Sequence, residues 1–76
     1  MNLNWLNVSD ITDMSNLFNI SWYGQFFIIS DWDVSNVTNM QDMFNGCHDF
    51  NQDLSKWNVS KVTNMQEMFN MCMKFN

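Results

Sequence analysis

The sequence predicts an α/β repeat fold of three units, each made of a short strand and a short α or 3₁₀ helix. Residues 32–51 and 57–76 are identical at fourteen of twenty positions at an offset of 25. A weaker copy, residues 8–18, precedes residues 34–44 at an offset of 26. One unit cannot bury its apolar side alone, so we expect the units to stack with like side chains in columns. Residues 1–76 then form a single repeat domain, with units at about 3–28, 29–53 and 54–76.

The first half of each unit is the predicted strand. It is rich in Val, Thr and Trp, which favour strands. In Leu54-x-x-Trp57-x-Val59, alternate residues of a strand would point inward. This spacing and the period of 25 to 26 residues match the leucine-rich repeat, so the predicted architecture is a leucine-rich-repeat-like solenoid. Val62 stands where that motif usually has Asn, which argues against its ordinary asparagine ladder.

The second half of each unit is the predicted helix. The segments MQDMF and MQEMF favour helix over strand. Thr38-x-x-Gln41 and Thr63-x-x-Gln66 fit a capping box at its start. A single long helix is excluded because Val34, Val37, Met40 and Met43 recur every three residues, which rotates them around a helix.

Composition excludes several classes of function. Three Lys and no Arg face eight acidic residues, giving a net charge of −5 and a pI near 4.1, so nucleic acid is excluded as a partner. The longest apolar run, residues 26–29, is too short for membrane insertion. The first residues lack the basic and apolar regions of a signal peptide.

The residues that carry catalysis or bind metals are sparse. The one His, His48, has no spaced partner for nucleophilic catalysis or zinc binding, so we expect no enzyme activity, no metal and no cofactor. Cys47 and Cys72 occupy one column of successive units. They form either a pair of buried thiols or a disulfide between neighbouring units.

The string W-x-V-S-x-V-T-x-M-x-x-M-F, followed by Cys and FNQDLS, occurs in residues 32–55. It resembles the tandem repeat of BspA-like leucine-rich-repeat surface proteins of bacteria. The resemblance implies cell adhesion and a location at the cell surface or outside the cell, although no signal or anchor is present in this chain. Binding residues are not standardised in that family, so the resemblance transfers no site. We expect an uncapped portion of a longer solenoid.

Two groups of residues are candidate contact surfaces. The outward strand face presents a flat polar ladder, which suits protein or glycan partners. Its members are Asn7, Ser9, Asp31, Asp33, Ser35, Lys56, Asn58 and Ser60. An aromatic cluster replaces the usual connector between units, and it is either an altered edge of the core or a contact surface. Its members are Trp22, Tyr23, Phe26 and Phe27.

These observations predict a non-catalytic protein-interaction or adhesion module. Its partner would be a protein or glycan on another cell or surface. The alternative is a structural spacer or self-stacking repeat unit with no ligand of its own, which associates through its uncapped ends.

Overall fold

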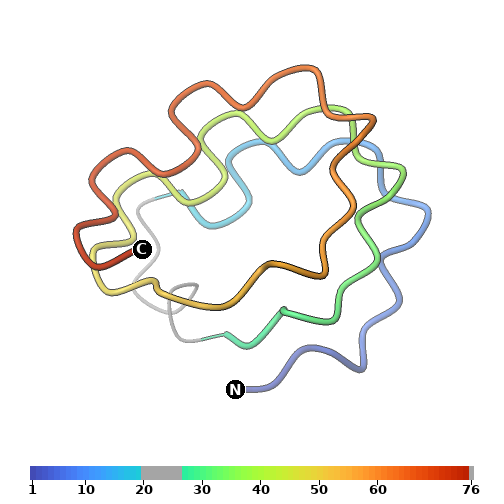
Figure 1. Ribbon diagram of the computed structural model, residues 1–76, viewed down its shortest axis with the longest axis horizontal. Helices are drawn as coiled ribbons and strands as arrows, with labels where there is room; N and C mark the ends of the chain where they lie inside the picture. Colours follow the sequence, from blue (N-terminus) through green and yellow to red (C-terminus); the bar gives the residue numbers. More distant parts are fainter. Residues whose placement is uncertain (20–26, 76) are drawn as a thin grey trace.

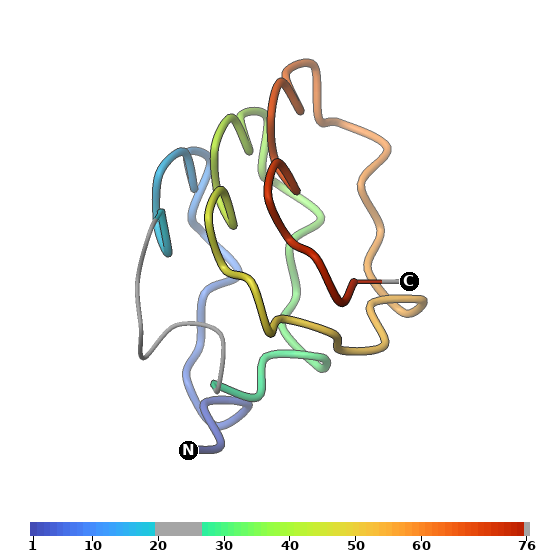
Figure 2. The same ribbon diagram turned by 90° about the vertical axis from the view of Figure 1, so that its left-hand side faces the viewer.

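The computed structural model describes residues 1–19 and 27–75 (Figure 1). The chain winds through three coils that lie side by side, coloured blue, green to yellow, and orange to red (Figure 2). These described residues contain no helix and no sheet. Their only β-type pairings are isolated parallel bridges, which join Asn2 to Ile28, Asp13 to Asn39, and Asn39 to Asn64.

The predicted α/β solenoid of strand-plus-helix units is therefore wrong, and the helical half fails for a clear reason. A helix needs consecutive N–H groups bonded four residues back in the same segment. Here the N–H groups of Met40, Asp42 and Phe44 donate to carbonyls of the next coil, at 2.8, 3.0 and 3.0 Å. Asp42 also has a φ of 57°, a left-handed conformation that ends a right-handed helix.

The predicted strand is absent because its N–H groups close turns within the coil. Trp32 N–H donates to the Ile29 carbonyl at 3.1 Å, and Val37 N–H donates to the Val34 carbonyl at 3.0 Å. These i to i+3 bonds are those of β-turns, and they leave no regular ladder between coils. Inward–outward alternation still holds, since Trp32 and Val34 are buried while Asp33 is exposed.

Like side chains do meet in columns, as the repeat predicts. The Phe18 and Phe44 rings stack with centroids 5.6 Å apart, and the Phe44 and Phe69 rings stack with centroids 5.5 Å apart. Burial is greatest in the middle coil: Met40 is fully buried, whereas Met65, its equivalent in the last coil, is 45% exposed. Met14, the equivalent in the first coil, is also buried, so the last coil is the one that leaves this column uncovered.

Asparagine and aspartate side chains shape the corners of each coil. The Oδ1 of Asn39 accepts the Gln41 N–H at 2.9 Å, and the Oδ1 of Asn64 accepts the Gln66 N–H at the same distance. This is the Asx turn, in which a side chain replaces a backbone acceptor. The same bond is made by Asn2, Asn7, Asp13, Asp33, Asp53 and Asn58. The abundance of Asn thus serves the turns.

Candidate binding surfaces

The predicted polar face lies on the right-hand side of Figure 1, where the blue, green and orange segments run alongside one another. Its side chains are held by local hydrogen bonds. The Oδ1 of Asp33 accepts both the N–H and the hydroxyl of Ser35, at 3.0 and 2.5 Å. Asn7 holds Ser9 in the same way in the first coil, at 3.0 and 2.7 Å. These pairs present polar groups in fixed positions.

The charged members of the polar face form an ion pair between coils. Lys56 Nζ lies 3.0 Å from Asp31 Oδ1, and the two side chains are 77% and 53% exposed. The hydrogen bond to Asp31, followed by the charge of that carboxylate, raises the pKa of Lys56. Asp31 is fixed in turn, because its N–H donates to the side chain of Asn4 at 2.9 Å.

The carboxylates of the Asx turns stay ionised to lower pH than ordinary aspartates. Hydrogen bonds from the Ser35 hydroxyl and N–H lower the pKa of Asp33. Ser55 lowers the pKa of Asp53 in the same order of causes, and the Ser15 N–H lowers that of Asp13. Each serine bond favours the charged form, so these turns are strongest when the aspartate is ionised.

Of the predicted aromatic cluster, Trp22, Tyr23 and Phe26 lie outside the described residues. Phe27 is half-buried, and its ring meets the Phe18 ring edge-on, with centroids 5.9 Å apart and planes at 68°. Phe27 therefore packs against the core and does not form a projecting contact.

Cys47 and Cys72 are both thiols, so the disulfide alternative is wrong. Each sulfur donates to a carbonyl of the preceding coil, Cys47 to Phe18 at 3.1 Å and Cys72 to Phe44 at 2.9 Å. Burial raises the pKa of the Cys72 thiol.

His48 is exposed. Within residues 1–19 and 27–75, no three His, Cys, Asp or Glu side chains gather as a metal site would need.

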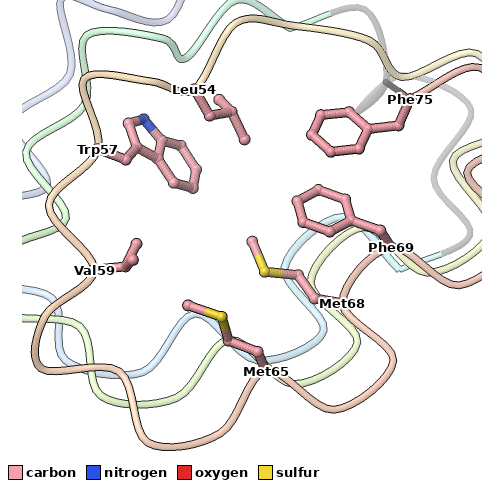
Figure 3. A pocket seen from close by; sticks show the side chains of 7 residues that line it. All are labelled: Leu54, Trp57, Val59, Met65, Met68, Phe69 and Phe75. Atoms are coloured by element: carbon pink, nitrogen blue, oxygen red, sulfur yellow. The ribbon is translucent and has the colours of Figure 1, made fainter.

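A further apolar surface is one that the candidate residues above do not include. The end of the last coil is open, and side chains point into its centre around a hollow of about 220 Å³ (Figure 3). The lining residues are Leu54, Trp57, Val59, Met65, Met68, Phe69 and Phe75. The repeat predicts this surface. In the middle coil the same columns are buried because a further coil covers them, and no such coil covers them here.

The first coil has an exposed apolar end as well. Leu6, Ile11 and Leu17 are 38%, 39% and 47% exposed. Their equivalents in the middle coil, Trp32, Val37 and Met43, are buried. Trp5 lies on the same coil and is 75% exposed. The first coil therefore exposes part of its apolar columns, whereas Val8, Met14 and Phe18 of the same coil are buried.

Stacked coils of like sequence, joined at intervals of about 25 residues, define a repeat protein. The chain belongs to the DUF285 family, described as Mycoplasma protein of unknown function, which matches residues 1–76. No curated protein and no solved structure matches the chain. In the described part of the chain, no helix is both long enough and apolar enough to cross a membrane.

Proposed function

We propose that this protein is a non-catalytic interaction module that binds a protein or glycan on another cell or surface through its polar face. The observation that supports this proposal is the row of fixed polar side chains on one exposed side. Pairs such as Asp33–Ser35 and Asn7–Ser9 recur in successive coils. A side chain already held in one rotamer loses little conformational entropy when it binds a partner.

The spacing of the row suits an extended partner. Equivalent groups on neighbouring coils repeat along the stack, so a peptide or glycan lying across the coils meets the same polar groups several times. Each contact is weak, and several together give affinity and register. The Lys56–Asp31 pair adds one charge of each sign beside this row.

The resemblance of residues 32–55 to BspA-like surface repeats supports adhesion as the biological setting. It also supports a location at the cell surface or outside the cell. On this proposal the chain has no substrate and no cofactor.

The experiment measures binding of the fluorescently labelled chain to monolayers of cultured epithelial cells. The test variant is Lys56→Glu, which reverses the charge on the polar face. The matched control is Lys74→Glu, because Lys74 is similarly exposed and lies 3.6 Å from Asp49, outside the polar face. We expect Lys56→Glu to weaken binding about tenfold, because it reverses a charge beside the row of polar contacts, and Lys74→Glu to change it less than twofold.

Pretreatment of the cells identifies the partner class. Loss of binding after protease treatment indicates a protein, and loss after glycosidase treatment indicates a glycan. An absence of saturable binding to any cell type contradicts the proposal. Equal affinities for the two variants also contradict it, because they would place the contact elsewhere.

A further inference from the structure

We propose that the open end of the last coil binds the first coil of a second copy of this chain, head to tail. This inference does not depend on the polar face, which lies along the side of the stack. The hollow at that end has a wholly apolar lining and a volume of about 220 Å³ (Figure 3). Pockets for drug-sized ligands typically start at about 300 Å³, so a flat coil fits the open end better than a small molecule.

The backbone groups at the two ends are complementary. Inside the stack, Met40 N–H donates to the Asn64 carbonyl of the next coil at 2.8 Å. In the same register, the N–H of Met65 is directed out of the last coil, and the carbonyl of Asp13 is directed out of the first. Neither group has a backbone partner within residues 1–19 and 27–75. A second copy stacked in register would pair them.

Three further backbone pairs follow from the same register. They repeat bonds that the middle coil already makes with its neighbours, at 2.8 to 3.0 Å. The pairs are Glu67 N–H with the Ser15 carbonyl, Phe69 N–H with the Leu17 carbonyl, and Thr12 N–H with the Thr63 carbonyl. Unpaired parallel edges of this kind are templates for another chain.

The apolar side chains at the two ends also match by column. Leu6 of the second copy would lie over Trp57, in the column that Trp32 fills inside the stack. Leu17 would lie over Met68, in the column of buried Met43. The exposed apolar side chains of the first coil would thereby cover part of the open end of the last coil. This apolar contact is the main source of affinity in the proposed interface.

Charge favours this pairing over contact between like ends. All three lysines lie in residues 54–75, but Lys56 and Lys74 pair with carboxylates of the middle coil, which leaves Lys61 as the lysine that bears on this interface. Residues 1–28 hold only Asp10 and Asp13 and carry −2. Lys61 Nζ bonds the Asn36 amide oxygen at 3.0 Å, and the next position in that column is Asp10 of the second copy. Opposite charges would therefore meet at the rim of the interface.

Because the two contacting surfaces differ, the interface is heterologous. A head-to-tail contact with the rotation of the repeat does not close on itself, so assembly would continue beyond a dimer. The predicted product is a series of oligomers whose mean mass rises with protein concentration. Added salt would shift this series towards the monomer, because it screens the attraction between the opposite charges at the rim of the interface.

Sedimentation of the full chain and two blocking variants tests the proposal. Met65→Lys places a charge on the open end of the last coil, and Leu17→Lys places one on the end of the first coil. Both residues are about half exposed, at 45% and 47%, so the monomer tolerates the change. Met73→Lys is the matched control, because Met73 is 73% exposed and does not line the hollow. Circular dichroism confirms that each variant remains folded.

The head-to-tail arrangement predicts a distinctive result. The unchanged chain and Met73→Lys form oligomers, whereas Met65→Lys and Leu17→Lys are each monomeric. An equal mixture of these two variants forms a dimer and nothing larger, because one intact end of each kind remains. If the unchanged chain is a monomer up to about 1 mM, the proposal is wrong. If Leu17→Lys alone still forms dimers, like ends join and the proposal is also wrong.

A pair of charge variants provides a second test at exposed positions. Asp10→Lys and Lys61→Asp each bring like charges together across the interface, and the double variant restores opposite charges. We expect the association constant to fall about threefold to tenfold in each single variant and to recover in the double variant. Additive weakening in the double variant would contradict the predicted register.

Discussion

Phe44 and Phe69 lie face to face, 25 residues apart in sequence, with ring planes only 8° from parallel. Such a small angle requires that the two coils carry their side chains in nearly identical directions. Offset-stacked aromatic pairs add to the stability that burial alone provides. The repeat in the sequence is thus a repeat of side-chain placement, with the core formed between coils.

The position of a coil in the stack should determine how much an identical substitution destabilises the protein. Met40→Ala empties a fully buried site and is expected to lower the free energy of unfolding by about 2–5 kcal/mol. Met65→Ala, in the same column, removes a side chain that is 45% exposed and should lower it by less than about 1 kcal/mol. Urea denaturation measures both values. Equal losses would show that the middle coil is not the core.

Backbone conformation predicts a stabilising substitution. Met71 has a φ of 63°, and Gly46 occupies the equivalent position in the middle coil with a φ of 81°. A side chain at positive φ is strained, so Met71→Gly should raise the free energy of unfolding by about 0.5–1 kcal/mol. Met73→Gly is the control; its φ is not positive, and the added freedom of the unfolded chain should lower stability. Destabilisation by both substitutions would contradict the backbone described above.

The Asx turns predict how stability depends on pH. Hydrogen bonds from Ser35 lower the pKa of Asp33 in the folded chain below its unfolded value of about 3.9. The unfolded chain therefore binds more protons as the pH falls through this range, and stability decreases towards the folded pKa. Above about pH 5 the contribution is fully present.

Asp33→Asn tests this effect. Asn7 and Asn58 occupy the same column and make the same turn, so the substitution keeps the hydrogen bond to the Ser35 N–H but no longer titrates. Thermal melts from pH 6 to pH 2 should show a weaker acid dependence than the unchanged chain. Asp33→Ala should be less stable at every pH, because it loses the turn. An acid dependence that Asp33→Asn leaves unaltered would count against these turns as its source.

The tryptophans of the repeat bond to the preceding coil. Trp32 Nε1 donates to the Leu3 carbonyl at 2.9 Å, and Trp57 Nε1 donates to the Ile29 carbonyl at 3.2 Å. Trp32→Phe keeps a buried ring but removes this bond between coils. The Leu3 carbonyl still accepts the Leu6 N–H at 3.0 Å, so the substitution should reduce stability by about 1 kcal/mol. The same substitution at Trp5, which is 75% exposed, should change stability by less than about 0.5 kcal/mol. Chemical denaturation measures both, and similar values would contradict the assigned bond.

The sequence predicts the columns well because identical residues at a fixed offset can bury one another only by stacking. Buried Val34 and Val37 and exposed Asp33 follow from that pattern. The local backbone was predicted wrongly, since capping-box spacing at Thr38 and Gln41 does not distinguish a helix from tandem turns. What decides it is the left-handed conformation of Asp42 and the donation of alternate N–H groups to another coil. Neither feature can be recognised from the helix and strand propensities of the local sequence.

The open apolar end illustrates a second limit of sequence reasoning. Met65 and Met40 are identical residues in identical motifs, yet one is 45% exposed and the other is fully buried. Only the position of a unit within the stack separates them. The polar ladder was predicted as a surface. That its side chains also form Asx turns could be recognised only from the observed bonds, such as that between Asp33 and Ser35.

Amide hydrogen exchange, measured by NMR on the monomeric Met65→Lys variant, tests the stacking of coils most directly. The account predicts slow exchange at alternate amides of the middle coil, Met40, Asp42 and Phe44, which donate to the next coil. Their equivalents in the last coil, at positions 65, 67 and 69, should exchange rapidly. Equal protection at these equivalent positions of the two coils would contradict the stacked arrangement.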